Sequence, residues 1–208
     1  MQKNLKAVSN KIKIKHKKII LLNQIHSDKF HYINMFSNIN KKFEGDALIT
    51  NKRGIPIAVL TADCAPVLIY DNSKIMIAAI HVGWKGAYKD IIKKVIKFMI
   101  KNGCSPLNIT ASVGPCISVD KYEVKADFIK KFIKKDNKNL FFFKKTKNKI
   151  YFDLSKYINF QLKSLNIKKI DTINKDTFNN KNNFFSARRS ISRNENDYGR
   201  NISIIMIN

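Results

Sequence analysis

The chain has 208 residues, of which 44% are hydrophobic and 26% charged, and its formal net charge is +25. Enough apolar side chains are present to bury a core, which excludes disorder of the whole chain. No apolar run is long enough to span a membrane, and the first twenty residues lack the apolar block of a signal peptide, so the sequence predicts a cytosolic protein. The positive charge does not predict nucleic-acid binding, because lysines are spread along the whole chain and no zinc-finger, RNP-like or basic-helix pattern occurs.

Short apolar runs typical of buried strands occupy the first part of the chain, at residues 18–22, 57–62, 67–70 and 75–80. After Gly86, apolar residues recur at helical spacing from Ile91 to Met99, and Gly103 stands where a C-cap glycine belongs. The first part of the chain therefore predicts strands followed by one amphipathic helix.

The second part continues with a strand at residues 109–113 and a helical stripe that includes Phe128 and Ile133. A further helix begins after Asp153, a suitable N-cap. A last strand covers residues 202–207, and the Asn/Lys-rich tracts 136–149 and 174–183 predict loops. Strands and helices intermingle without a linker or repeat, which predicts one layered α/β or α+β domain over residues 1–208.

Polar residues that interrupt apolar strands are the first candidates for chemistry, because a buried ionisable group is costly unless it is paired or bound to metal. His26 follows a strand-like run, Cys64 lies between two apolar runs, and His81 closes a strand. Zinc takes imidazole nitrogen and thiolate sulfur together, and three protein ligands leave one position open. A histidine at a strand end is equally compatible with a structural role, and a buried cysteine with simple packing, so spacing alone leaves both interpretations open.

Several segments, in one order along most of the chain, resemble the YfiH family of laccase-domain proteins, long labelled polyphenol oxidases. They are "QIHSD" from Gln24, "GDALIT" from Gly45, "VLTADCAPVLIYD" from Val59, "AAIHVGWKG" from Ala78, "SVGPCI" from Ser112, "YEV" from Tyr122 and "FFSARRS" from Phe184. The resemblance implies a zinc site formed by His26, Cys64 and His81 and an α+β fold, a layered α-β-β-α sandwich with mixed sheets. It also implies phosphorolysis of adenosine, inosine, guanosine and methylthioadenosine, with adenosine deamination as a further activity.

The chain has too few histidines for the multicopper oxidase that the older label implies. A multicopper oxidase needs many imidazoles for a trinuclear cluster besides its blue-copper site. The chain has four histidines, and His16 and His31 stand in Lys-rich or loop-like surroundings. We therefore expect zinc rather than copper.

The implied activities suggest catalytic roles. Deamination needs a carboxylate to move a proton, and Asp63 beside Cys64 is the first candidate, although it can instead anchor the turn. Phosphorolysis needs a cation-lined phosphate pocket, for which Arg188, Arg189 and Lys85 are candidates; an arginine pair can equally form surface ion pairs.

Further substrate-binding candidates come from the same segments. Gln24 is expected to orient His26, and Trp84 either stacks on a base or packs after a turn. Asp46 either caps a turn or binds a ribose hydroxyl, and Cys116 is either a pocket thiol or a buried filler. Ser186, in the "FFSARRS" segment, is the last of the substrate-binding candidates.

The chain departs from the family pattern in places. Only about twenty residues precede Gln24, so we expect an N-terminally shortened domain that lacks part of one pocket wall. Lys85 replaces an arginine and Ala187 a tyrosine, and both changes bear on the substrate pocket. Two alternatives stay open beside the phosphorylase: a hydrolase that edits peptidoglycan precursors, and a non-catalytic protein stabilised by zinc. The sequence does not indicate whether the protein is a monomer or an oligomer.

Overall fold

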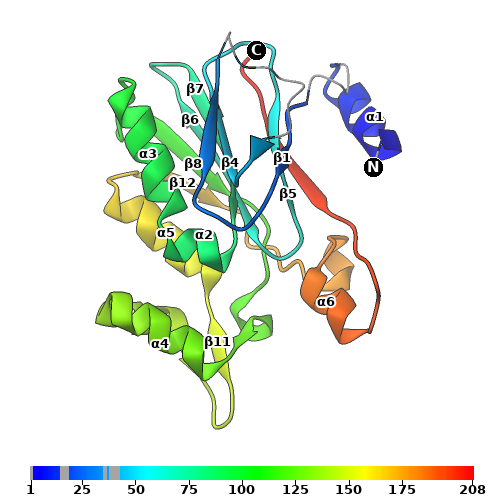
Figure 1. The fold of residues 1–208 in the computed structure, drawn as a ribbon, viewed down its shortest axis with the longest axis vertical. Coiled ribbons are helices and arrows are strands. Elements are labelled where there is room, and N and C mark those ends of the chain that lie inside the picture. Colours follow the sequence, from blue (N-terminus) through cyan, green and yellow to red (C-terminus); the bar gives the residue numbers. More distant parts are fainter. Residues whose placement is uncertain (1, 15–18, 35–36, 38–42) are drawn as a thin grey trace.

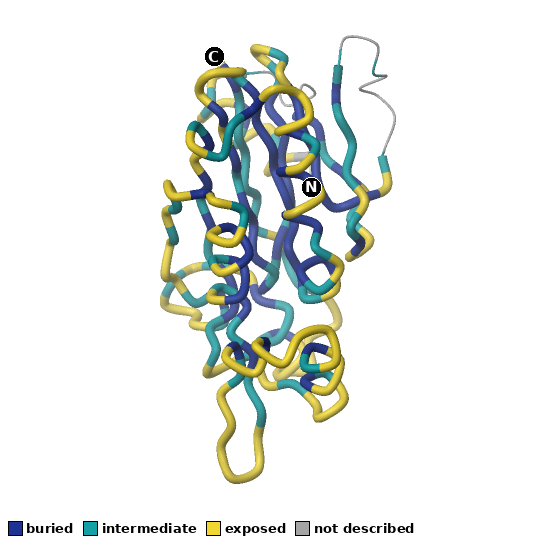
Figure 2. Tube along the Cα trace, turned by 90° about the vertical axis from the view of Figure 1, so that its left-hand side faces the viewer, coloured by how far each residue is buried: buried dark blue, intermediate teal, exposed yellow. Residues whose placement is uncertain are grey.

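A six-stranded mixed sheet forms the centre of the computed structural model, which describes residues 2–14, 19–34, 37 and 43–208. The strand order is β12-β8-β6-β7-β4-β2, and Figure 2 shows these central strands as the buried part of the molecule. The strands are β2 (Phe30–Ile33), β4 (Ala47–Thr50), β6 (Ala65–Asp71), β7 (Met76–Val82), β8 (Ile109–Val113) and β12 (Lys169–Thr172).

Different layers cover the two faces of this sheet (Figure 1). One face packs against helices α2 (Trp84–Tyr88), α3 (Ile91–Lys101) and α5 (Leu154–Ser164). The other packs against a second sheet, in which β5 (Ile57–Thr61) pairs antiparallel with β13 (Asn201–Ile205). Helix α1 (Gln2–Lys11) lies beyond this second sheet in Figure 1. The expected α+β fold with mixed sheets is confirmed.

The helices form where the sequence predicts them. Helix α3 buries its apolar stripe, from Ile91 to Met99, against the sheet. Each such side chain contributes roughly 1.5–3 kcal/mol by leaving water. Gly103 follows the end of α3 with φ of +90°, the left-handed conformation that glycine adopts without strain. Asp153 caps α5 by accepting a hydrogen bond from Lys156 N.

A small lobe extends below the main sheet (Figure 1). It contains helix α4 (Ala126–Lys135), the 3-10 helix η3 (Asn137–Phe142) and the sheet β10-β11-β9. These strands are β9 (Glu123–Val124), β10 (Phe143–Lys145) and β11 (Ile150–Phe152). The prediction of a loop over 136–149 is therefore wrong in its first part, because aromatic side chains such as Phe142 are buried in the lobe core.

Remaining elements are short: β1 (Leu22–Asn23), β3 (Phe43–Glu44), η2 (Val119–Lys121), η4 (Asn180–Asn182) and α6 (Ala187–Ser192). The strand predicted at 18–22 is reduced to Leu22 in β1 and an isolated bridge at Ile20, and Lys18 lies outside the described residues. Within the described ranges, no helix has the length and apolar character needed to cross a bilayer.

Candidate metal centre and adjoining pockets

His26, Cys64 and His81 converge at one edge of the sheet. One possible ligand atom from each side chain lies within 4.8 Å of the other two. Cys64 Sγ is 3.8 Å from His26 Nε2, and the two imidazole rings meet edge to face with centroids 4.8 Å apart. Tetrahedral zinc separates a bound sulfur from a bound nitrogen by roughly 3.6 Å. Chemistry and spacing of these donors fit a single metal ion.

Strand register brings the ligands together. Strand β6 pairs antiparallel with β7 so that Pro66 faces His81, which places Cys64, just before β6, near the end of β7. His81 is an internal residue of β7 rather than the residue that closes the strand, as the sequence had suggested. Cys64 and His81, which are distant in the sequence, thus lie at one edge of the sheet because β6 and β7 pair in this register.

Asp46 forms hydrogen bonds to two of the three residues, His26 and His81. Its fully buried carboxylate accepts a hydrogen bond from His81 Nδ1 at 2.8 Å, which leaves Nε2 of that ring for a metal. The same carboxylate accepts the main-chain N–H groups of His26, at 3.0 Å, and Ser27, at 2.5 Å. A carboxylate behind a ligating histidine fixes the ring and raises its basicity. Asp46 therefore supports the metal ligands and is inaccessible to a ribose, which corrects one of its two expected roles.

Two of the eight described non-glycine residues with positive φ lie at the same place. His26 and Asp63 have φ values of +55° and +85°, a region that side chains other than glycine rarely adopt. Asp46 holds the first turn through the His26 N–H. The Asp63 carboxylate accepts hydrogen bonds from Thr177 Oγ1 at 2.7 Å and from Arg188 N at 2.6 Å, which hold the second. The surrounding contacts thus maintain a conformation that the local sequence disfavours.

Gly83 allows the ligands to approach each other. A Cβ atom at this position would lie 2.9 Å from Cys64 Sγ and 3.0 Å from His26 Cδ2, both too close for ordinary packing. The Gly83 φ of −82° is open to any residue, so the space around the donors, and not the turn into α2, requires this glycine of the "HVGWKG" segment.

The electrostatics of the centre favour a cation. Burial alone would raise the pKa of the Cys64 thiol, but hydrogen bonds from His26 and His81 outweigh it and lower the pKa to about 7. Burial alone would lower the pKa of His81, but the hydrogen bond to Asp46 and the interaction with Cys64 raise it to about 9. Thiolate and carboxylate together stabilise a positive charge between them, so the donor set suits a divalent ion as well as a proton.

The remaining described histidine has a different environment. His31 lies in β2 rather than in a loop, and its Nε2 is 2.8 Å from the carbonyl of Glu44. His16 lies outside the described residues. In the described ranges, His26, Cys64 and His81 form the single group of three or more potential metal ligands.

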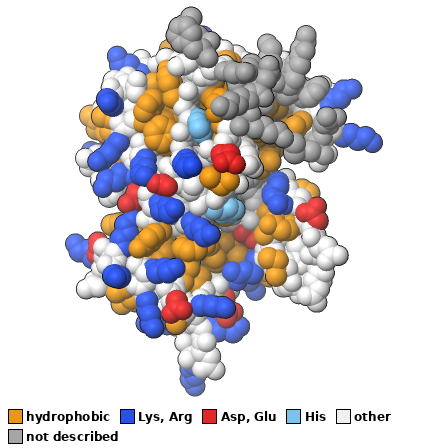
Figure 3. Space-filling view, in the orientation of Figure 1, with side chains coloured by type: hydrophobic (Ala, Val, Ile, Leu, Met, Phe, Trp, Pro, Cys, Tyr) orange, Lys and Arg blue, Asp and Glu red, His pale blue; other side chains and the backbone are white. Residues whose placement is uncertain are grey.

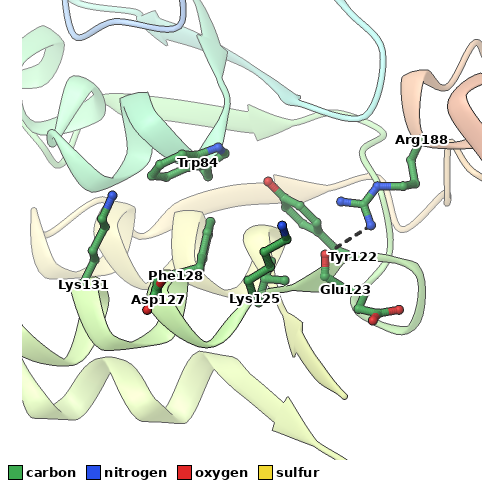
Figure 4. A pocket seen from close by; sticks show the side chains of 9 residues that line it. Trp84, Tyr122, Glu123, Lys125, Asp127, Phe128, Lys131 and Arg188 are labelled. Atoms are coloured by element: carbon green, nitrogen blue, oxygen red, sulfur yellow. Dashed lines mark hydrogen bonds between the residues drawn. The ribbon is translucent and has the colours of Figure 1, made fainter. Parts of the chain in front are cut away.

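Two hollows meet at the metal centre, and both are lined by His26, Cys64 and Tyr198. The first has a volume of about 280 Å³ and includes Gln24 and Arg200. The second, of about 190 Å³, includes Asp63, Tyr122 and Arg188. Tyr122 and Arg188 also line a third hollow of about 580 Å³, which contains Trp84, Phe128, Lys125 and Lys131 (Figure 4). The second hollow therefore shares wall residues with each of the other two.

Several predicted substrate ligands turn out to support the backbone. Both polar atoms of the Gln24 amide bond the main chain of Leu60, at 2.7 and 2.8 Å, rather than orienting His26. Ser186 is buried and caps α6 by accepting a hydrogen bond from Arg189 N at 3.1 Å. The Arg189 guanidinium donates to the carbonyls of Thr177, Phe178 and Phe184. These contacts correct the expected roles of Gln24, Ser186 and Arg189.

Other predicted residues lie nearer to the hollows or away from them. Arg188 separates the second and third hollows, and one of its Nη atoms donates to Glu123 O at 3.1 Å. Lys85 is exposed, with Nζ 5.8 Å from the centre of the Trp84 ring. Cys116 is buried and lines a further hollow with Ser118 and Asp153, and burial raises its pKa to about 12.

Sequence reasoning did not assign a role to Tyr122, Tyr198 or Arg200, which all line hollows at the centre. Tyr122 belongs to the quoted "YEV" segment, so a signal for it was present in the sequence. Tyr198 and Arg200 lie before β13 and reach the centre because this strand pairs with β5. That pairing has no local signature in the sequence.

Comparisons with known proteins find relatives over most of the chain. Residues 1–208 match the family described as multi-copper polyphenol oxidoreductase laccase. Among curated relatives, a protein of Rickettsia conorii named purine nucleoside phosphorylase is 35% identical over 186 residues, which are 88% of this chain and 75% of that protein. A purine nucleoside phosphorylase of Haemophilus influenzae is 32% identical over 189 residues, 89% of this chain and 73% of that protein.

Solved structures share the fold. The hypothetical protein YfiH of Bacillus licheniformis superposes with a TM-score of 0.89 at 24% identity, covering 99% of this chain and 80% of that protein. A Neisseria meningitidis protein superposes with a TM-score of 0.86 at 26% identity, covering 100% of this chain and 81% of that protein. These likenesses extend over nearly the whole chain and include the strands that carry the metal centre.

Proposed function

The chain belongs to the family described as multi-copper polyphenol oxidoreductase laccase, and from this premise we propose that it is a zinc-dependent purine nucleoside phosphorylase. The observation that carries the proposal is the convergence of His26, Cys64 and His81 where two hollows meet. The names of the relatives supply the reaction, and the geometry supplies a place for it.

The proposed reaction transfers a glycosyl group. An oxygen of phosphate forms a bond to C1′ of the nucleoside while the bond from C1′ to the purine nitrogen breaks. The electron pair of that bond stays with the purine, which takes up a proton, and the products are the free base and ribose 1-phosphate. The protein must therefore bind an anion beside a neutral nucleoside and orient both.

Arg188 is the residue to which we assign the phosphate. Its guanidinium lies at the boundary of two hollows, and a planar guanidinium suits two-point binding of phosphate. Asp63 acts as a positioning residue, because its carboxylate accepts the main-chain N–H of Arg188 and so fixes the start of α6. Arg189 is already bound to three carbonyls, and Lys85 lies at Trp84, so neither is placed to replace Arg188.

The metal centre is the second part of the proposal. Zinc held by His26, Cys64 and His81 would supply a Lewis acid at the junction of the hollows. Asp46 holds the His81 ring in the orientation that this requires. Zinc is favoured over copper because the described chain lacks the additional imidazoles of a multicopper cluster.

A metal and product analysis tests the proposal. The purified protein is analysed for zinc and copper, then incubated with inosine with and without phosphate while hypoxanthine and ribose 1-phosphate are measured. We expect zinc in the protein and hypoxanthine in the presence of phosphate. Adenosine in a parallel reaction separates the finer activities, since phosphorolysis yields adenine and deamination yields inosine. A zinc-loaded protein that forms no free base from any purine nucleoside contradicts the proposal.

A further inference from the structure

The largest of the three hollows combines aromatic and cationic groups. It has a volume of about 580 Å³ and lies between α2 and the lobe that contains α4 (Figure 4). Trp84 and Phe128 form an aromatic wall, with ring centroids 5.0 Å apart, and both are partly exposed. Lys125 and Lys131 line the same hollow, as does Arg188. We call this hollow the aromatic–cationic pocket.

Two carboxylates, those of Glu123 and Asp127, also line the pocket, and each has a lysine partner outside it. Glu123 pairs with Lys149, at 3.0 Å, and Asp127 pairs with Lys130, at 3.9 Å, and neither lysine lines the pocket. Arg188 donates to a main-chain carbonyl, which carries no net charge.

Lys125 and Lys131 have no acidic partner among the described side chains. Lys85 adds a further positive charge beside Trp84. Figure 3 shows Lys and Arg side chains around hydrophobic patches over the lower part of this face. The pocket therefore presents an aromatic wall in a positive field.

We infer that the aromatic–cationic pocket binds a purine nucleoside 5′-phosphate, with the base against Trp84 and Phe128 and the phosphate at Lys125, Lys131 and Arg188. Aromatic side chains stack on bases of any kind, and unpaired cations favour a ligand that carries an anion. A neutral nucleoside uses the wall but leaves the cations without a partner. The choice of a purine rests on the proposed function, whereas the preference for a charged ligand rests on the pocket.

The position of the pocket gives this binding a consequence. Tyr122 and Arg188 line both this pocket and the hollow at the metal centre, and the wall of Trp84 and Phe128 suits the base of a nucleoside as well as that of a nucleotide, so the two ligands need the same groups. The nucleotide is therefore expected to compete with the nucleoside.

Intrinsic fluorescence provides a direct test, because Trp84 is the single tryptophan of the chain. The protein is titrated with adenosine 5′-phosphate, adenosine and ribose 5-phosphate at low ionic strength, and calorimetry measures the same binding independently of fluorescence. We expect adenosine 5′-phosphate to change the fluorescence and to bind about five-fold or more tightly than adenosine. Raising the salt concentration should reduce this difference, since screening weakens exposed charge interactions.

A charge-matched pair of variants locates the effect. K125Q/K131Q removes two cations of the pocket, and K97Q/K101Q removes two exposed cations of α3, so both variants have the same net charge. We expect the first to lose the preference for the nucleotide and the second to retain it. Equal affinity for nucleotide and nucleoside overturns the inference, as does an equal loss in both variants. Ribose 5-phosphate binding as tightly as the nucleotide also overturns it, since the aromatic wall would then contribute nothing.

The two proposals fail separately. If the protein forms no base from inosine but binds the nucleotide with the expected preference, the proposed function is wrong and the inference holds. If phosphorolysis occurs and neither fluorescence nor calorimetry detects the preference, the proposed function stands and the inference is wrong.

Discussion

The metal centre and the aromatic–cationic pocket are neighbouring regions built in opposite ways. Asp46 and His81 at the centre are 0% and 3% exposed and are fixed by hydrogen bonds to buried main-chain and side-chain groups. In the pocket, Lys125, which directly precedes α4, and Lys131, on α4 itself, are exposed. The difference indicates that the centre tolerates little change, whereas the pocket can vary in its charge while the fold is kept. In our proposals, the type of reaction depends on the buried region and the ligand preference on the exposed one.

The largest effect is expected from a change of a ligand itself. Cys64→Ser replaces the thiolate by a hydroxyl, which is a poor zinc ligand at neutral pH. We expect the metal content to fall from about one ion per chain to near zero, and phosphorolysis to be lost with it. Metal analysis and the inosine assay measure both effects. Cys104→Ser is the matched control, because Cys104 is buried near Met76 and outside the centre; an equal loss of metal in this variant would contradict the assignment.

Gly83→Ala adds one methyl group beside two ligands. The new Cβ would lie within 3.0 Å of atoms of Cys64 and His26, so the donors must move apart. A displacement of about 1 Å at a reaction centre can reduce kcat/KM by about 100-fold, and we expect an effect of this size. Gly54→Ala serves as a control: it also changes a glycine, and the space around Gly54 is open, although its φ of +70° introduces strain there. Normal activity of Gly83→Ala with full metal content would contradict the claim that the metal centre tolerates little change.

Asp46→Asn keeps the shape of the side chain and removes its charge. Loss of such a partner behind a ligating histidine typically reduces metal affinity by about 10–100-fold. We expect a weaker zinc affinity in a competition titration with a chelator, together with a lower thermal stability, because the amide can accept fewer of the four hydrogen bonds that converge on Asp46. Unchanged zinc affinity would show that the His81 ring is held by other contacts.

The smallest effect is expected in the pocket. Trp84→Ala removes a base-stacking surface but touches no metal ligand, so we expect KM for inosine to rise roughly five-fold while the metal content stays constant. Trp84→Phe should recover most of the affinity, because it keeps an aromatic face. A loss of metal in Trp84→Ala would show that the two regions are coupled more tightly than their contacts indicate.

The sequence predicted one region far better than the other, for physical reasons. Histidine and cysteine are rare in this chain, and the family resemblance singled out His26, Cys64 and His81, which the fold brings within 4.8 Å of one another. The supporting role of Asp46 depends on the pairing of β4 with β7, which places Ala47 opposite Ile80 and so brings Asp46 to His81. This register is a property of the folded sheet and could not be read from a local segment.

The pocket was obscured by composition. Lysine and phenylalanine occur throughout the chain, so the side chains that line the pocket resemble those of every other surface segment. The same abundance made residues 136–149 look like a polar loop, although Phe142 and its neighbours pack into the lobe. Arg189 and Ser186 were misassigned because an arginine and a serine in a motif look the same whether they bind a ligand or a carbonyl. Contacts between segments that are distant in the sequence determine whether such a side chain binds a ligand or a main-chain carbonyl.

The pairing of β13 with β5 has a consequence for synthesis of the protein. His26, Cys64 and His81 all emerge from the ribosome more than a hundred residues before β13, whose partner strand β5 precedes Cys64 directly. At ordinary rates of translation this interval lasts on the order of ten seconds. During that time β5 lacks its partner strand and presents an unpaired sheet edge, so the growing polypeptide is most vulnerable to association with other chains before its last strand is made.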